Sequence, residues 1–152
     1  MNKKEKAKKL LEKLQEKEAE VKNLKKSFSE IDKEIFGDMQ RELSSEFPEV
    51  HVLQNSDSLL TKVLWEGRKF NLWIGKGQKR RGKYKLLCLF QLTIEEIQKE
   101  DVKYITDSEA SKWKDLFQKH INASIWSEFG STDYDGVLSC YKKALNKILN
   151  NK

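Results

Sequence analysis

Apolar residues in the first third of the chain recur at alternating steps of three and four. The series runs from Ala7 to Ile35, and Lys17 is its polar exception. This spacing is typical of a coiled-coil helix. We therefore predict a helical arm over residues 1–35 that forms a homodimer or docks on a partner. The alternative is an amphipathic helix that folds back on its own domain. The predicted contact residues are Leu10, Leu14, Val21, Leu24, Phe28, Ile31 and Ile35.

The same helical periodicity continues beyond the arm. Met39, Leu43 and Phe47 follow at steps of four, and Pro48 then ends the helix because a residue before proline disfavours the α region. Ser27 and Glu30 have the spacing of a capping box, which marks helix starts. The region is therefore either one long helix or two helices broken near Ser27.

Apolar and polar residues alternate in the middle of the chain, which is typical of β-strands. The candidate strands are residues 50–53, 58–67, 68–74 and 83–92. Gly67 follows Glu66 at a plausible tight turn between the second and third candidates. The pattern predicts a three- to four-stranded antiparallel β-meander.

Helical signals return after residue 92. Residues 93–96 resemble a capping box, and Thr106 or Ser108 could cap a second helix whose apolar face runs from Ala110 to Ile121. A last apolar series runs from Val137 to Leu149. Two to three C-terminal helices packed on the sheet make residues 36–152 an α+β globular domain.

Charge adds a preference for anionic partners. The chain has 152 residues, a formal net charge of +6 and a pI near 9.2. Such a balance favours DNA, RNA, a nucleoprotein enzyme or an acidic protein surface. No apolar run approaches the roughly 20 residues of a membrane span, so we expect a cytoplasmic protein with no membrane partner.

Much of the excess charge lies in one glycine-containing segment, residues 76–85, which holds six Lys or Arg residues and no acid. We predict a hairpin tip that binds a phosphate backbone, flanked by aromatic residues that could stack on a base. A solvated turn at a sheet end is the alternative. A nucleotide-binding loop is disfavoured because a strand pattern, not a helix, follows the glycines. The candidate contact residues are Lys76, Lys79, Arg80, Arg81, Lys83, Lys85, Trp73 and Tyr84.

Catalytic and metal-binding patterns are not apparent in the sequence. His51 and His120 are isolated, and we interpret Cys88 and Cys140 as buried small hydrophobes. The nearest approach to a nuclease motif is Asp57 with residues 66–69, where the spacing is poor. We expect no cofactor, no metal and no catalytic residue.

The sequence thus favours a non-enzymatic basic protein that binds nucleic acid or a nucleoprotein through the 76–85 hairpin. The first alternative is an adaptor or inhibitor, of the kind that a phage or mobile element encodes, that acts on a nucleic-acid-processing or defence enzyme. An atypical metal-dependent nuclease is the second alternative.

Overall fold

The computed structural model describes residues 2–65, 67–78, 86–94, 105, 107–121 and 124–150. The chain divides into two compact units, Met1–Glu34 and Ile35–Lys152. None of the helices in the described part of the chain is long and apolar enough to cross a membrane.

The first unit is helical and belongs to α1 (Lys3–Glu46). The side chain of Asn2 accepts a hydrogen bond of 2.9 Å from the backbone N–H of Glu5, which caps the helix start. Ser27 lies inside α1, so the alternative of two helices broken at this residue is wrong.

The second unit is built on an antiparallel sheet of six strands among the described residues, in the order β1-β2-β3-β4-β6-β5. The expected α+β class is confirmed, but the sheet has more than the three to four strands predicted. The strands are β1 (Val52–Asn55), β2 (Ser58–Trp65), β3 (Arg68–Gln78), β4 (Leu86–Ile94), β5 (Lys119–Ile121) and β6 (Ser124–Phe129).

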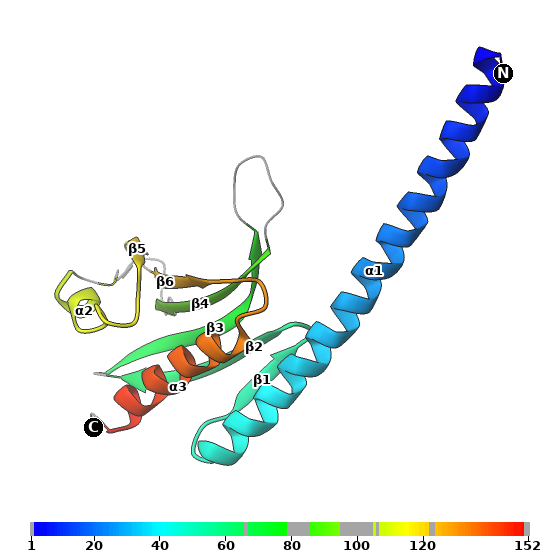
Figure 1. Cartoon of the computed structure of the whole chain (residues 1–152). Helices are drawn as coiled ribbons and strands as arrows, with labels where there is room; N and C mark the ends of the chain where they lie inside the picture. The colour runs from blue at the N-terminus through cyan, green and yellow to red at the C-terminus, as the bar shows by residue number, and fades with distance from the viewer. Residues whose placement is uncertain are drawn as a thin grey trace. The chain divides into compact units, whose positions relative to one another are not determined.

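The hydrophobic core lies on one face of this sheet, which we call the inner face. It carries fully buried residues such as Leu72 and Phe90, each contributing about 2 kcal/mol by burial. The helix α3 (Tyr134–Asn150) lies across this face, as Figure 1 shows. Tyr141 connects the two layers: its hydroxyl hydrogen-bonds that of Thr61, and its ring lies 5.8 Å from that of Phe90.

The C-terminal part of α1 completes the core of the second unit. Met39, Leu43 and Phe47 are buried, as the steps of four predict, and the neighbouring Phe36 is buried with them. On the surface, Lys142 of α3 forms an ion pair of 2.7 Å with Glu46. This hydrogen bond raises the pKa of Lys142.

The region between the sheet and α3 differs from the helical predictions at two places that the structure describes. Thr93 and Ile94, expected in a capping box, belong to β4, while residues 95–100 lie outside the described residues. The helix α2 (Asp107–Ser111) ends after five residues, and turns replace the expected helix over residues 112–116. The chain then forms β5 and β6, which pair with each other and extend the sheet beyond β4.

The physical reason is a competition between local and long-range contacts. Trp113 and Phe117 are four residues apart, which also suits a helix, but here both rings pack into the core, 6.0 Å from each other. β6 then satisfies its backbone hydrogen-bonding groups by pairing with β4. The paired residues are more than 30 positions apart in the sequence, so helical periodicity cannot reveal this contact.

Candidate nucleic-acid interface

The end of the β3–β4 hairpin extends beyond the neighbouring strands. Pairing of β2 with β3 ends at Ile74, and pairing of β6 with β4 ends at Cys88. β3 and β4 continue to pair as far as Gln78 and Leu86. Among the described residues, the end of the hairpin therefore forms a two-stranded ribbon with no further strand paired on either side, which Figure 1 shows at the upper end of the green strands.

The basic segment of the sequence joins the two ends of this ribbon. Residues 79–85, KRRGKYK, connect Gln78 to Leu86, and five of these seven residues are Lys or Arg. Of the predicted contact residues, Lys79, Arg80, Arg81, Lys83, Tyr84 and Lys85 lie outside the described residues.

Lys76 is the predicted cation that the structure describes, and its side chain lies on the inner face. Its ammonium donates a hydrogen bond to the backbone oxygen of Ser131. It also lies 3.4 Å from the sulfur of Cys88 and 4.6 Å from the ring centroid of Tyr134. Lys76 therefore holds the loop before α3 against β3, and we leave it out of the proposed contact surface.

Trp73 lies on the opposite, outer face of the sheet and is partly exposed. Its indole covers the backbone of Gly75: a Cβ added to Gly75 would lie 2.3 Å from Cζ2 of Trp73. Glycine at this position therefore lets the aromatic ring lie against the sheet.

A second tryptophan shares the outer face with Trp73. Trp73 pairs with Gln91 of β4, and Gln91 pairs with Trp126 of β6. Two strand spacings separate the Cα atoms of Trp73 and Trp126 by about 10 Å, and Gln91 lies between the two residues in the same row. Sequence reasoning missed Trp126 because β6 was not predicted. The available signal was the alternation of Ile125, Ser127 and Phe129 with Trp126 and Glu128, which the inward serine weakens.

The exposed apolar stripe of the first unit is the second predicted contact surface. Leu24 is 70% exposed and Leu10 62%, and the other predicted residues from Leu14 to Ile31 are also exposed. Ile35 differs, because it belongs to the second unit and packs against its core.

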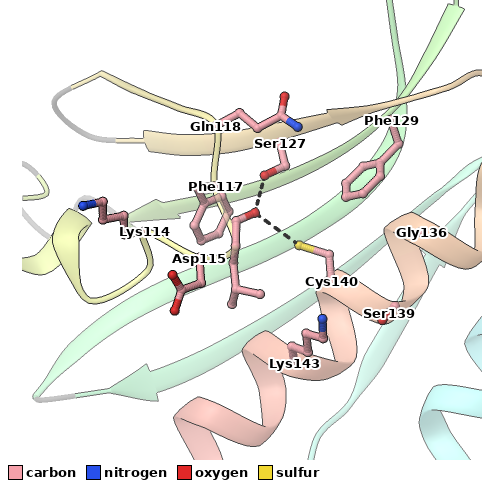
Figure 2. Close-up of a pocket in the computed structure, with 11 residues that line it drawn as sticks. Lys114, Asp115, Phe117, Gln118, Ser127, Phe129, Gly136, Ser139, Cys140 and Lys143 are labelled. Carbon is pink, nitrogen blue, oxygen red and sulfur yellow. Dashed lines mark hydrogen bonds between the residues drawn. The ribbon is translucent and has the colours of Figure 1, made fainter.

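A cavity of about 420 Å³ lies between α3 and the turn before β5, as Figure 2 shows. The backbone oxygen of Leu116 accepts hydrogen bonds from the hydroxyl of Ser127 and, at 3.7 Å, from the thiol of Cys140. Burial raises the pKa of Cys140 to about 12, so its thiol stays protonated at neutral pH and is a poor nucleophile. Cys88 is buried as well, which agrees with the interpretation of both cysteines as small core residues.

No group of three or more His, Cys, Asp or Glu residues is placed to hold a metal ion in the part of the chain that the structure describes. His51 is exposed, and His120 is in β5 with its side chain outside the described atoms. Asp57 lies in the turn between β1 and β2, and Glu66 is outside the described residues.

Comparison with known proteins finds no match to this chain among protein-family models, curated proteins or solved structures.

Proposed function

We propose that this protein is a non-enzymatic nucleic-acid-binding protein that contacts its ligand through the β3–β4 hairpin end and self-associates through the N-terminal part of α1. The proposal is supported by the sequence that joins β3 to β4. Residues 79–85 hold five cationic side chains and no acid, and they lie in the chain between Gln78 and Leu86, where the β3–β4 pairing extends past the pairing with β2 and β6.

Five cationic side chains within seven consecutive residues suit a phosphate backbone. Arginine offers bidentate donors to phosphate oxygens, and lysine offers point charges. Binding then releases counterions, so affinity falls steeply as salt rises.

The test is a charge reversal, Arg80→Glu with Arg81→Glu, measured by titration with duplex and single-stranded DNA and RNA at several salt concentrations. Losing two phosphate contacts reduces the slope of log K against log salt by about 1.4 to 1.8. The matched control is Lys114→Glu with Lys143→Glu, which changes the net charge equally at exposed positions beside the cavity of Figure 2.

Equal affinities of the hairpin variant and the control variant for nucleic acid would count against a contact through residues 79–85. If the wild-type chain binds no nucleic acid and instead co-purifies with one stoichiometric protein, the adaptor or inhibitor alternative replaces this proposal.

Self-association rests on the exposed apolar stripe of the first unit. Leucine, valine, phenylalanine and isoleucine side chains are exposed to water at heptad spacing. When two such helices pair, these side chains become buried between them. The native mass of the purified protein, with and without added nucleic acid, tests the oligomeric state and the ligand class together.

A further inference from the structure

We propose that the outer face of the sheet binds single-stranded nucleic acid, with unpaired bases stacked on Trp73 and Trp126. This inference rests on the proposed function, and it identifies the class of nucleic acid that the same surface takes. Stacking on aromatic side chains is a general means of holding unpaired bases, since every base has a π-face.

The outer face presents a continuous row of side chains across all six strands. From β1 to β5 the register aligns Leu53, Leu60, Trp73, Gln91, Trp126 and Lys119. Both tryptophans are partly exposed, in contrast to Trp65 and Trp113, which are 4% and 1% exposed in the core. The Gln91 amide between them has donors and acceptors that suit a base edge.

Glycines lead from Trp73 toward the basic segment. The outer-face positions of β3 after Trp73 are Gly75 and Gly77, and residue 79 begins the basic connection. Gly75 is explained by the indole that covers it. At Gly77 an added Cβ would meet Leu89 only at 3.4 Å, an ordinary contact. Packing against the described residues therefore does not require glycine at residue 77, and a glycine inside a strand often marks the close approach of a ligand.

The charges on this face suit a polyanion. Lys62 and Lys69 are exposed at outer-face positions of β2 and β3, and Lys119 is exposed on β5. Glu128 is the acid found at an outer-face strand position among the described residues, and it pairs with Lys119 at 3.2 Å. A phosphate backbone crossing the face therefore meets the exposed Lys62 and Lys69, while the charges of Lys119 and Glu128 offset each other.

The shape of the surface favours a single strand over a duplex. A duplex keeps its base faces stacked inside, where a sheet surface cannot reach them, whereas a single strand can bring its base faces to the partly exposed indoles. DNA and RNA single strands share this chemistry, so both are included in the test.

The experiment uses the full chain and its own tryptophan emission. The probes are oligothymidylate, oligouridylate and a mixed-sequence duplex of about 20 units, longer than the site of one small binding domain. Base stacking on Trp73 and Trp126 quenches the emission of these two residues, while Trp65 and Trp113 are shielded in the core. This readout needs no substitution, so it remains informative even if a variant fails to fold.

The variants separate stacking from charge. Trp73→Ala and Trp126→Ala each weaken single-strand binding by about 5- to 150-fold, with little effect on the salt slope. Trp73→Phe and Trp126→Phe keep an aromatic face and recover most of the affinity. Leu11→Ala, which removes an apolar side chain that is 56% exposed in the first unit, is the control and leaves binding unchanged.

The outcomes distinguish the two proposals. Quenching by single strands, lost in the alanine variants and recovered in the phenylalanine variants, supports the stacking surface. If the alanine variants bind as well as wild type while Arg80→Glu with Arg81→Glu does not, the sheet face is excluded and the hairpin proposal stands. If no nucleic acid binds, both proposals fail. Preference between oligothymidylate and oligouridylate assigns DNA or RNA.

Discussion

At the scale of single residues, Gly75 lies directly beneath the indole of the candidate contact residue Trp73. Indole atoms of Trp73 occupy the space that a Cβ on Gly75 would take, at 2.3 and 2.6 Å. Because the indole is the movable end of a side chain, the ring has to give way in a Gly75→Ala variant. Orientation of the ring can therefore be tested without changing any charge.

We expect Gly75→Ala to destabilise the domain by about 1–3 kcal/mol through overpacking and to turn the Trp73 indole away from the sheet. Acrylamide quenching of tryptophan emission should increase, and single-strand affinity should fall. Gly77→Ala is the control: its new Cβ meets Leu89 at 3.4 Å, so stability should change by only about 0.5 kcal/mol. Identical quenching in the two variants would contradict the proposed placement of the ring.

Cys140 predicts how stability changes at alkaline pH. Burial disfavours the thiolate and raises the pKa of Cys140 in the folded chain from its ordinary value of 9.0 to about 12. Between these values the folded chain holds a proton that the unfolded chain has lost, so the free energy of unfolding falls as pH rises. The slope due to this thiol is up to about 1.4 kcal/mol per pH unit.

Urea unfolding of wild type and Cys140→Ala between pH 8 and about pH 11 measures this effect. The variant should be less stable at pH 8, because it loses buried atoms, but its stability should fall less steeply with pH. Burial also raises the pKa of Tyr141, so some alkaline loss remains in the variant. Parallel curves would show that the thiol ionises at its ordinary pKa.

At the scale of elements, the N-terminal part of α1 presents an apolar stripe, whereas its C-terminal part is buried in the second unit. Leu14 and Leu24 are 58% and 70% exposed, whereas Phe36 and Leu43 are fully buried. The heptad pattern therefore changes its role along one helix, from a surface stripe to a core stripe.

Replacing Leu14 and Leu24 with Glu should convert an associated form of the protein to monomers, because paired carboxylates at the seam repel and cannot be buried. Sedimentation velocity or native mass spectrometry measures the change. Gln15→Glu with Asn23→Glu adds the same charge at positions outside the a and d series and should leave the oligomer intact. A wild-type protein that is monomeric at high concentration would refute self-association.

At the scale of the whole molecule, the core and the proposed binding surface belong to the same unit. Residues 35–152 contain every buried hydrophobic side chain of the core. Of the 25 residues in the range 2–26, ten are Lys and five Glu, so their net charge is +5. Removing residues 2–26 therefore removes positive charge without removing a core side chain.

Deleting residues 2–26 should leave a folded monomer in which Ser27, with Glu30, can cap the shortened helix. We expect its thermal midpoint to lie within about 5 °C of the full chain, since no core side chain is removed. Single-strand binding should persist, weakened, and should still be reduced by Arg80→Glu with Arg81→Glu. Calorimetry and the emission titration measure the two effects, and loss of the melting transition would show that the arm is needed for folding.

The amino-acid sequence by itself determined the features that depend on neighbours a few residues away. The alternation over residues 68–74 puts Phe70, Leu72 and Ile74 on one face and Trp73 on the other, as in the structure, because the side-chain period of a strand is two. Steps of three and four likewise marked α1, and the apolar series from Val137 marked α3. The positive charge of residues 79–85 is also readable from sequence alone.

Only the tertiary structure decided which distant segments meet. Trp126 shares a row with Trp73 because β6 pairs with β4, and Lys76 lies on the inner face of β3, where Ser131 and Tyr134 from 55 or more residues away receive its ammonium. Such contacts depend on chain closure over long distances and on competition among many pairings, so no local pattern records them. Local periodicity predicts the faces of each element, whereas long-range pairing determines which faces form one surface.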